Sequence, residues 1–283
     1  MLKALPDSGF VMMQSADPVN YFDLLRVTAK ANRAYCLRHG IPYLCAHTVM
    51  RGFHPLHACY NRVFFLNDLL DLGFQGWFLH LDADAYVADL GFDIAAHLAD
   101  RPDRSFVITH GATAAPWDVN DGIFFANCAH PDTHRLARRW QHWIMTLAPE
   151  RLRASPDWGQ VPDDQHLLHG TLRETPDLTA AFEYASKDFM NTDRARFIRQ
   201  VLRARERDLA RRVDLVALDV ERVLAAHGAA PDPLLPAMAG IARALGQPVP
   251  DGAPLMAAAA GDRDALVGVL EGLIRAARRT PAA

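Results

Sequence analysis

The sequence lacks features that would indicate a membrane span or a polyanion-binding protein. None of its apolar runs approaches the roughly 20 uninterrupted residues that a bilayer span needs, and its 283 residues carry a formal net charge of only −3. A chain so close to neutral has no basic field to attract nucleic acid, so we expect no nucleic-acid partner. Peripheral contact with a membrane stays open.

Cysteine is scarce, and its spacing indicates neither a disulfide framework nor a metal cluster. Four cysteines are present, none of them in a CxxC pair (Cys36, Cys45, Cys59 and Cys128). The chain also opens without a charged segment followed by an apolar one, which a secretory signal would require. We therefore expect reduced thiols and a cytoplasmic location.

Short apolar runs alternate with helical periodicity over the first half of the chain. Residues 9–15, 41–47 and 76–82 are predicted strands, and residues 21–40 and 57–73 between them are predicted helices that end at Gly40 and Gly73. Further strands are predicted at 105–110 and 118–128, followed by an amphipathic helix at 134–148. This alternation predicts an α/β fold with a parallel, doubly wound sheet.

The composition shifts towards Ala, Arg and Leu from about residue 194. The stretch 195–228 has a long helical pattern, and the Pro-rich segment 228–236 separates it from two more Ala-rich helical stretches. We predict two regions, a domain at 1–205 and a helical C-terminal extension at 206–283 that serves as a cap or an oligomerisation element. Three arginines share one face of the predicted helix, where they are either solvated or contact a phosphate group (Arg196, Arg199 and Arg203).

The most informative stretch is GWFLHLDADAYVADL, residues 76–90, in which an apolar run leads directly into Asp82 and Asp84. Two carboxylates at this spacing repel each other and are costly to desolvate, so a bound cation is the simplest compensation. Ligands of open α/β sheets collect beyond the carboxyl ends of the strands, and Mg²⁺ and Mn²⁺ bridge carboxylates to substrate phosphates. The alternative is a surface turn with two solvated aspartates, which the flanking apolar residues weaken.

Four segments together resemble a known enzyme family. NRAYCLRHGIPY (32–43), GWFLHLDADAYV (76–87), DVNDGIFFANC (118–128) and PDDQHLL (162–168) are similar, in order and spacing, to the retaining α-galactosyl and α-xylosyltransferases. The resemblance covers about the first 200 residues. It implies a glycosyltransferase-A fold, which is a Rossmann-like, mostly parallel sheet flanked by helices, here with an α-helical C-terminal tail.

The same resemblance implies a reaction and its substrates. Members of the family use Mn²⁺, for which Mg²⁺ is an alternative here, and transfer a sugar from a nucleoside diphosphate sugar to an acceptor hydroxyl. The acceptor is expected to be a carbohydrate, a lipid-linked precursor or a protein. In such a retaining transfer, a nearby carboxylate and amide stabilise the positive charge that develops on the sugar.

Donor-binding roles follow from the matching positions. Asp82 and Asp84 match the metal-binding DxD motif. Arg62 stands where the family usually has a lysine, suited to a phosphate charge, although a solvated helix arginine is equally consistent with its position. Asn120 and Gly122 match a block near the donor sugar, where the glycine permits close backbone approach.

The remaining site positions follow in the same way. Asp121 replaces an alanine of that block and is expected either to bind a sugar hydroxyl or to cap a turn. Asp163, Asp164 and Gln165 match a DDQ block beside the reaction centre, and we expect Asp164 or Gln165 to face the anomeric carbon. Asp163 is also placed to cap a helix. Two residues near the first strand are weaker candidates for nucleoside binding, namely Ser15 and Tyr21.

One departure from the family leaves two other functions open. The family contributes a third metal ligand from a late histidine, but residues 188–203 contain none. Water and diphosphate, Asn191 or an earlier histidine would then complete the shell, or the protein is a catalytically inactive sugar-nucleotide-binding or scaffold protein. A haloacid dehalogenase-like phosphatase with Asp82 as nucleophile is the other alternative. It is weakened because Tyr86 stands where Thr or Val is expected.

Overall fold

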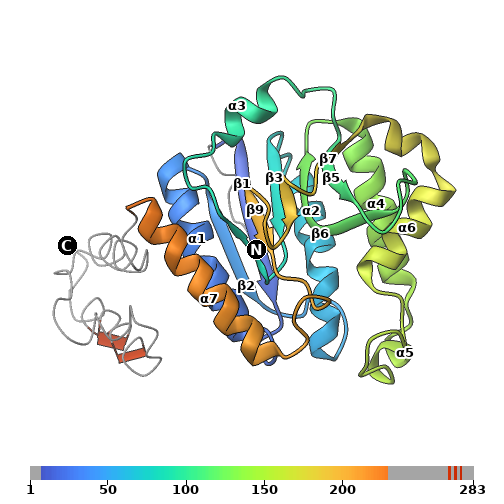
Figure 1. Cartoon of the computed structure of the whole chain (residues 1–283). Helices are drawn as coiled ribbons and strands as arrows, with labels where there is room; N and C mark the ends of the chain where they lie inside the picture. The colour runs from blue at the N-terminus through green and yellow to red at the C-terminus, as the bar shows by residue number, and fades with distance from the viewer. Residues whose placement is uncertain (1–7, 229–266, 269–270, 273–274, 276–283) are drawn as a thin grey trace, which may run out of the picture. The chain divides into compact units, whose positions relative to one another are not determined.

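The computed structural model describes residues 8–228 and, further on, residues 267–268, 271–272 and 275 (Figure 1). The chain falls into two compact units, 1–223 and 224–283, and the fold and the site described below belong to the first. The two Ala-rich helical stretches predicted beyond residue 236 lie almost wholly outside the described residues. Among those that are described, no helix is both long and apolar enough to cross a membrane.

A six-stranded sheet forms the centre of the first unit. Its strands lie in the order β2-β1-β3-β6-β5-β7, and all of them run parallel except β6, which is antiparallel to both of its neighbours. The predicted α/β class with a mostly parallel sheet is therefore confirmed. The bounds are β1 Phe10–Ala16, β2 Tyr43–His47, β3 Trp77–Leu81, β5 Phe106–His110, β6 Val119–Asn127 and β7 Phe182–Ala185.

Helices cover both faces of this sheet (Figure 1). Helix α1 (Phe22–His39) lies on one face, and α2 (Asn61–Asp71), α4 (Pro131–Thr146) and α6 (Asp164–Glu174) bury their apolar sides against the other. The predicted end of the first helix is confirmed, because Gly40 adopts a φ of +64° and its N–H donates to the carbonyl of Cys36. The shorter helices are η1 Pro55–Tyr60, α3 Ile94–Ala99, α5 Pro149–Arg153 and η2 Pro176–Ala181.

A second, three-stranded sheet corrects the prediction for the C-terminal part of the first unit. It consists of β4 (Ala85–Val87), β9 (Ile198–Gln200) and β8 (Met190–Thr192), in the order β4-β9-β8. The predicted long helix from residue 195 is wrong at its start, since a helix, α7 (Leu209–Ala226), begins only at residue 209. Pairing of β9 with β4 outweighs the helical propensity of this Arg- and Ala-rich stretch.

The three arginines that the helical pattern placed on one face do not share a helix face in the structure. Arg199 lies in β9 opposite Tyr86 of β4, and its Nη1 contacts Asp219 of α7 at 2.6 Å. Arg196 precedes the strand and is exposed, whereas Arg203 follows it. The period of two in β9, with Ile198 and Gln200 buried and Arg199 only half-buried, is that of a strand.

Buried polar side chains hold the backbone of the segment 82–87, which follows β3. Gln14 of β1 donates to two carbonyls of this segment at 2.8 Å each, and Thr28 of α1 donates to a third at 2.8 Å. Asn32 of α1 accepts a hydrogen bond from the N–H of Val87 at 2.7 Å and donates to Gln14 at 2.7 Å. The backbone that carries both aspartates is therefore fixed by side chains of the first strand and first helix.

We predict that Asn32→Ala lowers the free energy of unfolding by about 3 kcal/mol, because it leaves the buried N–H of Val87 without an acceptor. Urea denaturation followed by circular dichroism measures the change. Leu37→Ala on the exposed side of the same helix is the control, with an expected change within about 0.5 kcal/mol. Equal midpoints for the two variants would contradict this account of the network.

Candidate active site

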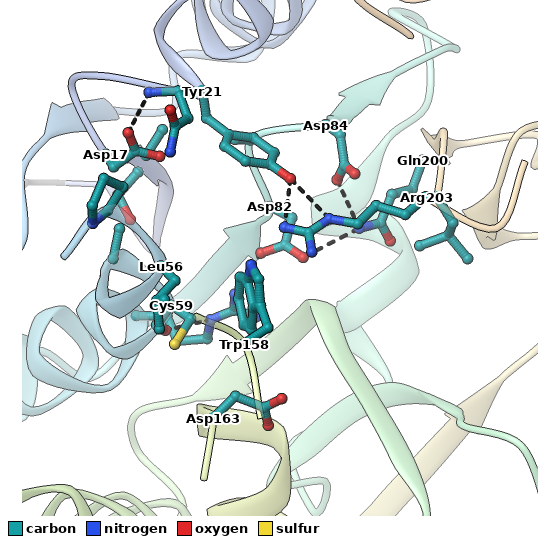
Figure 2. A pocket seen from close by; sticks show the side chains of 18 of the residues that line it. Asp17, Tyr21, Leu56, Cys59, Asp82, Asp84, Trp158, Asp163, Gln200 and Arg203 are labelled. Carbon is teal, nitrogen blue, oxygen red and sulfur yellow. Dashed lines mark hydrogen bonds and ion pairs between the residues drawn. The ribbon is translucent and has the colours of Figure 1, made fainter. Parts of the chain in front are cut away.

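A pocket of about 680 Å³ lies at the carboxyl ends of β1 and β3, where ligands of open α/β sheets collect (Figure 2). Its walls come from segments far apart in the sequence, brought together by the two sheets and the loop before α6. These segments are residues 15–21, 55–62, 82–84, 156–163 and 200–204.

The predicted site residues divide into two groups. The first group lines the pocket and consists of Ser15, Tyr21, Arg62, Asp82, Asp84 and Asp163. The second group comes from β6 and the start of α6 and consists of Asn120, Asp121, Gly122, Asp164 and Gln165. Members of the second group contact residues of the first or one another, so the sequence blocks that lie 40 to 80 residues apart do meet in space.

Arg62 is the centre of a buried cluster of ion pairs. Its Nη2 donates to Oδ1 of Asp82 at 2.5 Å, and its Nε lies 2.8 Å from Oδ2 of Asp164. Its Nη1 donates to the backbone carbonyl of Asp121 at 2.5 Å and lies 3.5 Å from the carboxylate of the same residue. Arg62 is thus not a solvated helix arginine: its one guanidinium lies among carboxylates from the segment after β3, from β6 and from α6.

The carboxylates of this cluster differ in their tendency to hold a proton. Burial raises the pKa of Asp84 to about 6, and the neighbouring charge of Asp82 adds to the effect. Burial likewise raises the pKa of Asp121 to about 6, against the opposing effect of Arg62. For Asp82, burial also favours the protonated form, but Arg62 and His80 outweigh it, so the pKa of Asp82 lies below its usual value.

The two aspartates of the DAD segment share one further partner, Gln200 of β9 (Figure 2). Its Nε2 donates to Oδ1 of Asp84 at 2.8 Å and to Oδ2 of Asp82 at 3.2 Å. Gly122 of β6 packs against this group, since a Cβ at residue 122 would lie 2.8 Å from Oδ2 of Asp82 and 2.9 Å from Nε2 of Gln200. A side chain at residue 122 would therefore have no room beside Asp82 and Gln200, and an approach of Gly122 to a donor sugar stays a prediction.

The DDQ segment begins α6. Asp163 is its N-cap and accepts a hydrogen bond from the N–H of His166 at 2.8 Å, so the capping role is confirmed. Asp164 is buried, and Oε1 of Gln165 accepts from the N–H of Asp121 at 3.4 Å. Asn120 accepts a hydrogen bond from the N–H of Gly122 at 2.9 Å. Of these contacts, the one between Gln165 and Asp121 joins α6 to β6.

Aromatic and cationic side chains meet at the mouth of the pocket (Figure 2). Nε and Nη2 of Arg203 donate to Oη of Tyr21 at 2.9 and 2.6 Å, and the guanidinium of Arg203 lies 4.7 Å from the centre of the Trp158 ring. Arg212 of α7 also donates to Tyr21, at 3.0 Å, and its Nη1 lies 3.6 Å from Oδ2 of Asp84. This arrangement supplies positive charge and aromatic faces for an anionic, ring-containing ligand.

The donor groups present fit a hard divalent cation. Asp82, Asp84, Asp121 and Asp164 face two guanidinium groups, those of Arg62 and Arg212, which leaves two negative charges when all four carboxylates are ionised. Among the described residues, no set of three or more His, Cys, Asp or Glu side chains is arranged to hold a metal ion. A cation here would rest on Asp82 and Asp84 and on oxygens from other sources, which is typical of Mg²⁺ at phosphate sites.

Sequence reasoning missed Gln200 and Arg212 and did not single out Trp158 or Arg203 from among similar residues. Gln200 and Arg212 lie in a stretch whose local pattern is helical, so no signal marked them as neighbours of an aspartate more than 100 residues earlier. The alternation at 198–200 is one of burial, which the structure shows and the sequence alone does not. Trp140 of α4 is a core residue whose Nε1 donates to the carbonyl of Asp164.

The fold is similar to that of a solved glycosyltransferase. A crystal structure of a glycosyltransferase involved in the glycosylation of the major capsid of PBCV-1 superposes with a TM-score of 0.55 at 16% identity, covering 74% of this chain and 98% of that one. At this identity the match establishes a shared fold. No protein-family model matches the chain, and no curated protein matches it either.

Two structures of the glycosyltransferase GlyE from Streptococcus pneumoniae TIGR4 are also similar, at a lower level. The apo form has a TM-score of 0.45 at 11% identity over 79% of this chain and 65% of that one. The other has a TM-score of 0.41 at 12% identity over 64% and 46%, respectively. TM-scores below 0.5 do not establish a shared fold.

We predict that Arg62→Gln lowers the free energy of unfolding at pH 7.5 by about 4 kcal/mol, because it leaves two buried carboxylates and the half-buried one of Asp82 without their shared counter-charge. Arg62→Lys keeps the charge but cannot reach all three partners, so we expect a loss of about half that size. Chemical denaturation of the three proteins measures both values. An unfolding midpoint of Arg62→Gln equal to that of the unaltered chain would refute the central role of this guanidinium.

Proposed function

We propose that this protein is a metal-dependent glycosyltransferase that moves a sugar from a nucleoside diphosphate sugar to an acceptor hydroxyl, with retention of configuration. The observation that carries the proposal is the position of Asp82 and Asp84 at the end of β3, in a pocket at the ligand-binding edge of a fold shared with a glycosyltransferase. A cytoplasmic location and a carbohydrate, lipid-linked or protein acceptor belong to the same proposal.

Donor binding is assigned to the residues of the pocket. Asp82 and Asp84 would hold Mn²⁺ or Mg²⁺, which supplies positive charge to the diphosphate when bound. Arg203 at the pocket mouth adds a guanidinium for a phosphate oxygen, and Tyr21 and Trp158 offer aromatic faces to the base or the sugar. Arg62, engaged with its three carboxylates, holds Asp82 in place.

The transfer step is assigned to the layer formed by β6 and α6. As the bond from sugar to diphosphate breaks, positive charge develops at the anomeric carbon, and nearby carboxylate and amide oxygens stabilise it. We keep Asp164 and Gln165 as the groups nearest this carbon, with Asn120 and Asp121 as contacts to sugar hydroxyls. Arg62 and the N–H of Asp121 orient Asp164 and Gln165, respectively.

A second candidate function is a catalytically inactive protein that binds sugar nucleotides. The hydrogen bonds from Gln200 to both aspartates favour it, because they occupy the oxygens that a cation would need. The phosphatase alternative requires Asp82 as a nucleophile, yet its Oδ1 accepts from Arg62 and its Oδ2 from Gln200. Calorimetric titration with uridine and guanosine diphosphate sugars, with and without Mn²⁺, followed by a donor-hydrolysis assay, separates the three functions.

We predict that Asp84→Asn lowers turnover at least about a hundredfold, because it removes a carboxylate that would hold the cation that stabilises the diphosphate in the transition state. Donor hydrolysis and transfer at saturating donor measure the change. Asp103→Asn, an exposed carboxylate outside the pocket, is the matched control and should leave turnover unchanged. Activity near that of the unaltered chain in Asp84→Asn would count against the assignment.

We predict that Arg203→Ala weakens binding of a nucleoside diphosphate about tenfold, because it removes the guanidinium at the pocket mouth. Calorimetry with uridine and guanosine diphosphates in the presence of Mn²⁺ measures the affinity. Arg196→Ala is the control, since Arg196 is exposed and does not line the pocket. Equal losses in both variants would show that only the general charge of the chain matters.

A further inference from the structure

Gln200 occupies an unusual position for a neutral side chain. It is only 3% exposed, and its carboxamide contacts both aspartates of the DAD segment through one nitrogen, Nε2 (Figure 2). Its other polar atom, Oε1, is buried and has no hydrogen-bond partner. A buried acceptor left without a donor is destabilising by about 1–3 kcal/mol, so this atom calls for an explanation.

An exchange in position of the two ends of the Gln200 carboxamide provides an explanation for this unpaired oxygen. A half-turn about the Cγ–Cδ bond places Oε1 where Nε2 now lies. The turn breaks the two hydrogen bonds of Nε2 and none of Oε1, which makes none. With no cation present, the turned amide would bring Oε1 of Gln200 close to one carboxylate oxygen of Asp82 and one of Asp84, and the three oxygens would repel one another. With a divalent cation between them, the same three oxygens become ligands.

The distances suit this second arrangement. Adjacent ligands of an octahedral ion at about 2.1 Å lie about 3.0 Å apart. The atom of Gln200 that faces the carboxylates is 2.8 Å from one and 3.2 Å from the other. The end of the carboxamide therefore already has the spacing of a ligand adjacent to both aspartate oxygens.

We propose that Gln200 is the third protein ligand of the divalent cation, through Oε1, and that its carboxamide turns over when the cation binds. This inference rests on the proposed metal-dependent function. Without the cation, the NH₂ group of Gln200 holds the two carboxylates together. With the cation, the carbonyl oxygen completes an all-oxygen set with Asp82 and Asp84.

The other candidates for this role are less well placed. Nε2 of His80 lies 3.6 Å from Oδ1 of Asp82, an oxygen that already accepts a hydrogen bond from Arg62. Asn191 donates to Thr109 of β5 at 2.7 Å and does not line the pocket. Gln200 alone among the three contacts both aspartates.

Ligand chemistry gives this assignment a consequence for metal choice. A set of two carboxylates and an amide oxygen is hard and favours Mg²⁺ and Mn²⁺, whereas an imidazole nitrogen favours Co²⁺, Ni²⁺ and Zn²⁺. Gln200→His would therefore keep a ligand at this position and shift the preference towards the latter ions. This substitution replaces one possible ligand with another. It therefore tests whether the side chain at residue 200 binds the metal ion, and not only whether a side chain is needed there.

The experiment measures Mn²⁺ binding to the full chain without donor, by the loss of the free-ion electron paramagnetic resonance signal. We expect Gln200→Ala to weaken Mn²⁺ binding at least about tenfold, since loss of even an outer-shell partner costs that much. Gln75→Ala, an exposed glutamine that precedes β3 and so lies at the strand end opposite to Asp82, is the control and should leave binding unchanged. Circular dichroism and unfolding midpoints establish that each variant is folded.

Gln200→His provides the second readout. We expect pulsed measurements on its Mn²⁺ complex to show strong coupling to a directly bound ¹⁴N, which the unaltered chain lacks, and its affinity for Ni²⁺ relative to Mg²⁺ to rise at least tenfold. These outcomes support the inference even if Gln200→Ala does not fold.

Failure of the inference and failure of the proposed function give different results. Mn²⁺ binding by the unaltered chain, with equal affinity in a folded Gln200→Ala and no ¹⁴N coupling in Gln200→His, would overturn the assignment of Gln200 alone. No Mn²⁺ binding by the unaltered chain, with or without a uridine or guanosine diphosphate, would overturn both the assignment and the proposed metal dependence.

Discussion

The site depends on an excess of buried negative charge around Arg62. Two aspartates from the segment that follows β3, one from β6 and one from α6 face only two guanidinium groups. In surroundings that solvate charge poorly, such an excess is tolerated only if protons or a cation compensate it. The raised pKa values of Asp84 and Asp121 show the first way, and a bound divalent ion is the second. The proposed cation would therefore compensate the same excess of negative charge that protonation of Asp84 and Asp121 otherwise relieves.

The fold holds these charges in place before any ligand arrives. Gln14, Thr28 and Asn32 hold the backbone of the segment 82–87 by hydrogen bonds, and Gly122 lets β6 approach Asp82 closely. Repelling groups would otherwise move apart, so the buried polar network balances the repulsion with rigid packing. Because these groups are already in place, little reorganisation would be needed when the proposed anionic donor binds.

The sequence predicted those parts of the site that depend on local pattern. An apolar run that ends in Asp82 marks a strand end, and Asp163 before a helical stretch marks an N-cap; both features need only a few neighbouring residues. The partners of Arg62 were not predictable in this way, since they come from three separate segments. Gln200 was missed for a stronger reason: its local pattern is helical, and only pairing with β4, more than 100 residues earlier, makes it a strand residue.

The segment from β9 into α7 supplies polar side chains beside the aspartates, although it lacks the late histidine that the family resemblance implied. Residues 200–212 contribute Gln200, Arg203 and Arg212 to the surroundings of the aspartates, in place of the late histidine of that family. A guanidinium 3.6 Å from Asp84 would compete with the proposed cation for the same negative charge. This competition would lower the affinity for a free cation, so under the proposed function the diphosphate of the donor would supply the remaining ligands. Cation and donor are then expected to bind together, with each increasing the affinity for the other.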